Sequence, residues 1–346
     1  MIHKINLKNK AGVLALLLLA LVSGMGLSSC VHQFPEEDTI GNVYITVLQD
    51  TEWLPDSVVT LTRAGETDVN IRYDFRLYRK GNTNDIIKEF SIVKDDLTRQ
   101  DFKTQLELMP GDYDLYCWSD YVDAKTGKAL YYDDSDFADI TYIKPYEGDT
   151  DLRDAFRGMT TFTVEGSGYA QIKPVEATIT LTRPLARYKF IATDLAEFIE
   201  NEITRGKMTN EPASGPYDAQ RWAKLSDYTV RVVYPLYMPA VFNNFRNNPV
   251  DSWTGVSFNC QMQQLNADEA QLCMDYTYVN GNESSVQVQL EVYDAQGGLI
   301  ARTNTITVPT KRDRTTLVYG KFLTTIRSDG VGINPDFEGE YNIEIK

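Results

Sequence analysis

This 346-residue sequence contains only two histidines and four cysteines, and it has no excess of positive charge. Its two histidines, His3 and His32, both lie near the N-terminus. The rest of the chain therefore has no material for a His-based catalytic triad or a His-ligated zinc site. The 34 Lys and Arg residues face 49 Asp and Glu residues, for a net charge of −15. Because nucleic acids are bound through cationic surfaces, this balance argues against a nucleic-acid partner.

Motifs for other chemistry are also scarce. No glycine-rich phosphate-binding motif follows a predicted strand, so no nucleotide cofactor is expected. Paired carboxylates stay formally open as catalytic groups, since 49 acidic residues can place two close together in space. The acidic segments 131–139 and 148–151 fit either calcium binding through oxygen ligands or solvated loops. The sequence predicts a protein that is not an enzyme and has no catalytic residue, cofactor or metal centre.

Long hydrophobic runs are limited to one, Ala11 to Val22, which follows a lysine-rich start and is too short to span a bilayer. This pattern predicts a secretory signal over residues 1–29. The ending Leu27-Ser28-Ser29-Cys30 resembles the bacterial lipobox. On that resemblance Cys30 becomes the lipidated N-terminus, and its acyl chains, such as palmitate, hold the protein in the outer membrane.

A short polar tether, residues 30–39, follows the lipidation site. It carries Glu36, Glu37 and Asp38, and it resembles the acidic export signal of surface lipoproteins in Bacteroidetes. A solvated linker explains the same residues, and both interpretations stay open. The export interpretation predicts a lipid-anchored protein exposed on the cell surface.

The body of the chain has the pattern of β-structure. Residues 70–79 and 286–292 alternate apolar and polar side chains, which is typical of half-buried strands. Similar short runs separated by turn residues predict an all-β protein of antiparallel sandwiches. One helix is expected after Asp194, with Asp194 and Glu197 forming a capping box.

Two domains are expected from the length of the chain. A strand that ends at Arg183 runs directly into another that starts at Leu185, so the boundary is placed between residues 183 and 184. The N-terminal sandwich then covers residues 40–183 and the C-terminal sandwich covers residues 184–346. Each is large enough to bury its own core.

Aromatic residues outside the alternating runs are candidates for stacking against sugars. They are Trp53, Tyr217, Trp222 and Trp253, all in segments that read as loops. Most other aromatics fall at inward strand positions and are expected in the core. A surface glycan-binding lipoprotein is therefore the alternative functional prediction.

Three cysteines remain in the body of the chain. Cys260 and Cys273 would lie opposite each other if their strands formed a hairpin centred between residues 266 and 267. That geometry permits a disulfide, and two buried free thiols are the other interpretation. Cys117 is expected as a core thiol.

Several short motifs along the chain together carry a family resemblance. They are Leu106 to Tyr116 with Pro110-Gly111 at its centre, residues 151–158, residues 181–188, residues 255–258 and residues 332–341. These segments resemble the fimbrillin-like lipoproteins of Bacteroidetes, which include type V pilus subunits and their anchor and accessory proteins. The resemblance implies two tandem transthyretin-like antiparallel β-sandwiches and a structural or adhesive role, with other pilin subunits or host and bacterial surface ligands as partners.

In polymerising members of that family, an Arg-specific protease cuts after an arginine that follows the first strand. A strand of the next subunit then fills the groove that opens. The matching candidate is Arg63, which follows Val58 to Thr62. An ordinary charged residue at a strand end is the other interpretation of Arg63, and the motifs do not separate an anchor from a shaft subunit.

Overall fold

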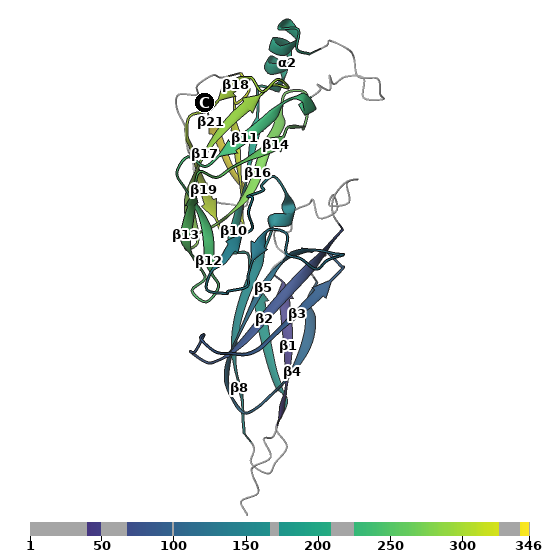
Figure 1. Ribbon diagram of the computed structural model, residues 1–346, viewed down its shortest axis with the longest axis vertical. Helices are drawn as coiled ribbons and strands as arrows, with labels where there is room; N and C mark the ends of the chain where they lie inside the picture. Colours follow the sequence, from purple (N-terminus) through teal and green to yellow (C-terminus); the bar gives the residue numbers. More distant parts are fainter. Residues whose placement is uncertain are drawn as a thin grey trace, which may run out of the picture.

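The computed structural model describes residues 40–49, 68–98, 100–166, 173–208, 225–324 and 340–345. In Figure 1 they form two β-sandwiches stacked end to end, with the first half of the chain in the lower one and the second half in the upper one. Within these ranges no helix has the length and apolar character needed to cross a bilayer. The predicted all-β fold with one minor helix is confirmed.

The lower sandwich consists of a three-stranded and a four-stranded sheet. Its strands are β1 (Gly41–Gln49), β2 (Val69–Arg79), β3 (Ile86–Lys94), β4 (Phe102–Leu108), β5 (Gly111–Asp123), β8 (Phe156–Val164) and β9 (Val175–Leu181). The sheet orders are β4-β1-β9 and β3-β2-β5-β8. The predicted alternation holds on β2, where Ile71, Tyr73, Phe75 and Leu77 are buried in the core between the sheets.

The predicted Pro-Gly turn carries the chain from β4 in one sheet to β5 in the other. Gly111 has a φ of +149°, and a Cβ at this position would lie 1.8 Å from Nη1 of Arg79. That guanidinium donates a hydrogen bond to the carbonyl oxygen of Pro110 at 3.3 Å. The positive φ is therefore what favours glycine here, because the end of the flexible Arg79 side chain can shift to admit a Cβ.

The upper sandwich is built mainly from the second half of the chain. Its strands are β10 (Leu185–Ala192), β11 (Thr229–Val233), β12 (Tyr237–Asn243), β13 (Asn248–Thr254), β14 (Ser257–Gln261), β15 (Gln263–Gln264), β16 (Ala270–Tyr278), β17 (Glu283–Tyr293), β18 (Leu299–Arg302), β19 (Ile306–Lys311), β20 (Thr315–Gly320) and β21 (Glu340–Ile345). One sheet has the order β15-β16-β10-β20-β21, and the other has the order β14-β11-β17-β18, with β19 also paired to β17. The pairing is mostly antiparallel, as expected, but β1–β9, β10–β20 and β20–β21 are parallel pairs.

A short insert from the first half of the chain completes the upper sandwich. Strands β6 (Tyr132–Asp133) and β7 (Ile140–Tyr142) extend a sheet with the order β13-β12-β7-β6, and Thr141 pairs with Val241. The 3-10 turns η2 (Asp151–Arg153) and η3 (Leu225–Asp227) are the other short elements. The division of the chain between residues 183 and 184 coincides with the gap between β9 and β10 and stays a proposal. A division at this point places the paired strands β7 and β12 in different domains.

Buried ion pairs hold this insert and the junction between the sandwiches. Arg153 and Asp275 are both almost completely buried, and Nε of Arg153 lies 3.2 Å from Oδ1 of Asp275. Arg183 donates two hydrogen bonds to Asp154, at 2.6 and 2.9 Å, and also pairs with Asp313. Removing one partner of such a pair leaves an uncompensated buried charge, which typically costs about 3–5 kcal/mol. The two sandwiches are therefore joined by specific contacts as well as by the chain itself.

Helix α2 (Leu195–Thr204) forms where it was predicted, but the capping box does not. Asp194 makes no side-chain cap bond to the helix. Its carboxylate instead accepts hydrogen bonds from the backbone N–H groups of residues 322–324, at 2.8–3.3 Å. The prediction of the cap was wrong because a distant segment supplies better-placed donors than the first turn of the helix.

The acidic segment 131–139 is organised by an arginine. Nη2 of Arg72 lies 2.8 Å from Oδ1 of Asp134 and 2.9 Å from Oδ2 of Asp120, and both carboxylates are buried. Burial and the nearby Asp120 raise the pKa of Asp134 to about 8. In the described ranges, no group of His, Cys, Asp and Glu side chains has the arrangement of a metal site. Asp134 is thus neither a solvated loop residue nor part of such a group.

A pH dependence of stability follows from Asp134. Because its pKa in the folded chain exceeds the value of about 3.9 expected when unfolded, the folded state holds more protons between about pH 4 and 8. Stability therefore falls as the pH rises through this interval. The Asp134→Asn variant does not lose this stability. We therefore expect the difference in free energy of unfolding, variant minus parent, to increase by about 1 kcal/mol or more between pH 5 and pH 9.

Urea denaturation at the two pH values measures this difference. Asp136→Asn changes an exposed carboxylate of the same segment and is expected to follow the parent at both pH values. A constant difference between Asp134→Asn and the parent would contradict the assignment.

Candidate functional site

Strand β1 lies in the middle of the three-stranded sheet although it is near the N-terminus. It pairs with β4 along residues 41–47 and with β9 along residues 43–49. Its inward residues Val43, Ile45 and Val47 are completely buried. Figure 1 shows this strand in purple in the lower sandwich. The alternation of aliphatic and polar residues in the sequence is what places it there.

Removal of β1 would expose both backbone and core. Among the described strands β4 pairs with β1 alone, and so does β9 in this sheet. Their N–H and C=O groups that face β1 would therefore lose these hydrogen bonds. Burial of each aliphatic side chain of β1 contributes about 1.5–3 kcal/mol. The empty position would be a groove lined by core residues and flanked by two open edges. A strand with alternate apolar residues fits such a groove.

The end of β1 is fixed by polar contacts. The backbone N–H of Gln49 donates to Oδ1 of Asp101 at 2.8 Å, and Nε2 of Gln49 donates to the hydroxyl of Tyr73 at 3.1 Å. Residues 50–67, with the predicted cleavage site Arg63, follow directly and lie outside the described residues, as does the predicted lipidation site Cys30. Both sites stay predictions.

Strand β21 occupies an edge of the upper sandwich. It pairs in parallel with β20, from Thr315 with Glu340 to Gly320 with Ile345, and it stands last in the order of its sheet. Its sequence alternates Tyr341, Ile343 and Ile345 with polar residues. This is the same period-two pattern as Val43, Ile45 and Val47 on β1. The segment is therefore matched in pattern to the position of β1.

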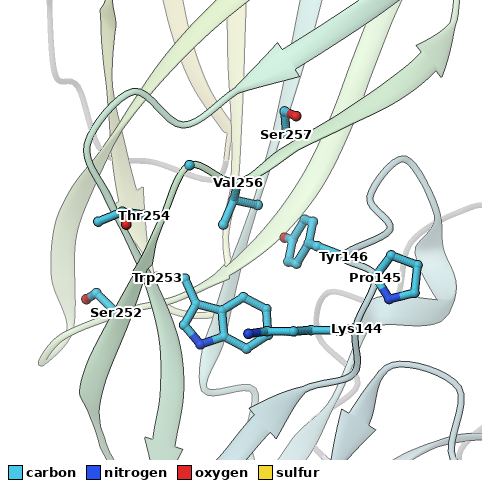
Figure 2. A pocket seen from close by; sticks show the side chains of 9 residues that line it. Lys144, Pro145, Tyr146, Ser252, Trp253, Thr254, Val256 and Ser257 are labelled. Atoms are coloured by element: carbon cyan, nitrogen blue, oxygen red, sulfur yellow. The ribbon is translucent and has the colours of Figure 1, made fainter.

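Of the four predicted sugar-stacking aromatics, the structure describes only the surroundings of Trp253. Trp53, Tyr217 and Trp222 lie outside the described residues, and their stacking role stays a prediction. Trp253 is half-buried on β13 and lines a cavity of about 510 Å³ with Lys144, Tyr146 and Ser257 (Figure 2). Lys144 and Tyr146 come from the loop after β7, and nothing in the local sequence placed them beside Trp253.

The indole of Trp253 is partly occupied by its neighbours. Nζ of Lys144 lies 4.3 Å from the ring centroid, and Tyr142 meets the indole edge-on with the ring centroids 6.1 Å apart. Figure 2 shows the Lys144 side chain lying along the indole. A sugar that stacks on this face must therefore share it with a cation. The stacking role of Trp253 stays a prediction.

The predicted hairpin between Cys260 and Cys273 was wrong in register. Gln263 on β15 pairs with Gln271 on β16. Cys260 instead belongs to β14 in the other sheet, where it pairs with Val230. The Cys260 and Cys273 side chains lie in the same buried cluster, and Cys117 is buried in the other core, as expected. Burial raises the pKa of Cys260, as does the Cys273 thiol. A disulfide between them stays a prediction.

Comparison with protein-family models assigns the chain to a family. A model described as a family of unknown function, DUF6562, matches residues 36–346. A search of curated proteins finds no match.

Several solved structures are similar in fold. A candidate adhesin of Bacteroides thetaiotaomicron is 10% identical over 76% of this chain and 79% of its own, with a TM-score of 0.43. The fimbrial anchor protein Mfa2 of Porphyromonas gingivalis is 11% identical over 76% and 81%, with a TM-score of 0.38. A fimbrial assembly protein of Parabacteroides distasonis is 11% identical over 81% and 90%, with a TM-score of 0.39. All three TM-scores are below 0.5, so none of these likenesses identifies what the chain binds.

The burial of the three body thiols predicts low reactivity. Burial keeps the reagent from all three thiols. For Cys260 and Cys273 it also raises the pKa, and this lowers the fraction of the reactive thiolate. In a mature chain carrying Cys30→Ser, we expect iodoacetamide at pH 8 to leave all three thiols unmodified in the native protein and to label them in urea, as measured by mass spectrometry. An added Ser135→Cys substitution, at an exposed position, supplies a fast-reacting control.

Rapid labelling of Cys260 or Cys273 in the native protein would contradict this burial. Labelling of Cys117 alone in urea would instead show that Cys260 and Cys273 are joined in a disulfide.

Proposed function

We propose that this chain, which belongs to the family of unknown function DUF6562, is a non-enzymatic structural component of the bacterial surface. Lipid on Cys30 holds it to the outer membrane, and it assembles with other pilin subunits by β-strand donation. The observation that carries this proposal is the position of β1, a strand near the N-terminus that is buried between β4 and β9.

The polymerising mechanism requires a strand that can be replaced without rebuilding the fold. β1 satisfies this requirement because it belongs to the sheet β4-β1-β9, and the four-stranded sheet opposite does not include it. Cleavage after Arg63 would separate β1 from β2 while leaving β2 in its own sheet. The open groove would then bind an incoming strand through backbone hydrogen bonds and alternate apolar side chains.

The C-terminal segment is the proposed donor. Among the described strands β21 pairs with β20 alone, and its Tyr341, Ile343 and Ile345 repeat the spacing of Val43, Ile45 and Val47. A donated β21 gives up its pairing with β20 and pairs with both β4 and β9 of the next copy. Buried apolar side chains and two new ladders then favour the assembled state.

An uncleaved chain has a different role. With β1 in place and Cys30 lipidated, the lower sandwich is complete and accepts no further strand. Such a chain serves as an anchor or accessory adhesin at the membrane end of a pilus, and host or bacterial surface molecules are its ligands.

Controlled cleavage tests the proposal. We expect an arginine-specific protease to cut a mature chain carrying Cys30→Ser after Arg63, and the product to form a ladder of oligomers on an unheated denaturing gel. The reason is that loss of residues 30–63 opens the groove of one copy to the C-terminal segment of another. Mass spectrometry of the product confirms the cleavage point.

Two variants serve as controls. Arg63→Lys keeps the charge but resists the protease at that bond, so it should stay monomeric. Deletion of residues 340–346 should allow cleavage and prevent the ladder. A cleaved parent that stays monomeric, or a ladder that survives the deletion, would refute strand donation by this segment.

Glycan binding at the cell surface is the second candidate function. The cavity beside Trp253 favours it, because cavities of about 300–1,000 Å³ lined by aromatic side chains are typical of small-ligand sites. This function does not require polymerisation. It is compatible with an anchored monomer or with a subunit of a fibre.

A further inference from the structure

The cavity at Trp253 joins two segments that are distant in sequence. One is the loop Lys144-Pro145-Tyr146 after β7, and the other is the end of β13 with the start of β14. In Figure 2 the Trp253, Tyr146 and Lys144 side chains gather on one side of β13. Ser252 and Thr254 lie on the other side of that strand, as alternation requires. Two aromatic rings and one ammonium group therefore lie together on one side of the cavity.

Lys144 is the one charged side chain among the residues that line this cavity. Within the described ranges its Nζ forms no ion pair, and its recorded contact is the indole of Trp253 at 4.3 Å. Glu147 and Asp251 are close in sequence, but neither lines the cavity. Asp275, which accepts a hydrogen bond from the Tyr146 hydroxyl at 2.6 Å, is buried and paired with Arg153. In a chain with a net charge of −15, this is a local positive site.

The arrangement has parts that recognise different portions of one ligand. The ring of Trp253 offers apolar surface to the C–H face of a sugar. Tyr146 is half-buried and adds only its uncovered part, because the Arg153 guanidinium lies over its ring, 4.2 Å from the centroid. The indole holds the ammonium of Lys144 in place by a cation–π contact, and this leaves its N–H donors for an anion. Ser257 accepts a hydrogen bond from Arg231 at 2.9 Å, so its hydroxyl proton is available to a ligand hydroxyl.

We propose that this cavity binds an anionic sugar, with its carboxylate or sulfate on Lys144 and its ring against Tyr146 and Trp253. The inference rests on the second candidate function, glycan binding, and specifies the class of glycan. A neutral sugar would gain the apolar contact and leave the ammonium unpaired. An anionic sugar gains both the apolar contact and a charge-assisted hydrogen bond from the ammonium group of Lys144.

Calorimetric titration of the mature chain carrying Cys30→Ser tests the assignment. The probes are α-1,4-linked digalacturonate, galactose 6-sulfate and, as the neutral counterpart, α-1,4-linked galactobiose. We expect at least one anionic probe to bind about tenfold more tightly than galactobiose, and this preference to shrink as salt is added. Lys144→Gln should abolish the preference and leave galactobiose binding unchanged, with the melting temperature as a check on folding.

Lys128→Gln removes an exposed lysine outside the cavity and should keep the preference. Trp253→Leu should weaken all probes. Equal binding of anionic and neutral probes would overturn the anionic assignment while keeping glycan binding. Absence of binding by every probe would overturn both, and the response to protease cleavage would be unaffected in either case.

Discussion

The pairing of β1 with two neighbours is the constraint on which the lower sandwich depends. Its sheet has three strands and β1 is the central one, so the backbone of β4 is satisfied only while β1, or a strand like it, is in place. The same strand contributes Val43, Ile45 and Val47 to the core. A single segment thus completes both the hydrogen bonding and the hydrophobic core. The lower sandwich therefore needs a strand at this position. In the proposed assembly, an equivalent strand from another copy takes the place of β1.

The junction between the sandwiches is the second structural theme. Strands β6 and β7 leave the lower half of the chain to extend a sheet with β12, and η2 places Arg153 against Asp275 of β16. Arg183, between β9 and β10, closes the junction by pairing with Asp154 and Asp313. These contacts restrict the hinge motion that a bare linker between the two sandwiches would allow.

Regular alternation made much of this fold predictable. β2 and β17 follow strict period two, and the structure has them where the sequence predicted them. β13 was missed because Asn248-Pro249 and Asp251-Ser252 give it no alternation; its place comes from pairing with β12. The hairpin of Cys260 and the cap of Asp194 failed for a related reason. In each case a partner from a distant segment outweighed the local pattern. The cavity shows the same limit, since the sequence singled out Trp253 but not Lys144.

The structure of an oligomer formed after cleavage at Arg63, determined by electron cryo-microscopy, tests the central claim most directly. The account predicts that residues 340–345 of one copy lie between β4 and β9 of the next, with Tyr341, Ile343 and Ile345 in the positions that Val43, Ile45 and Val47 hold in the monomer. Oligomers in which β1 still occupies that position, or in which copies meet through other surfaces, would contradict it.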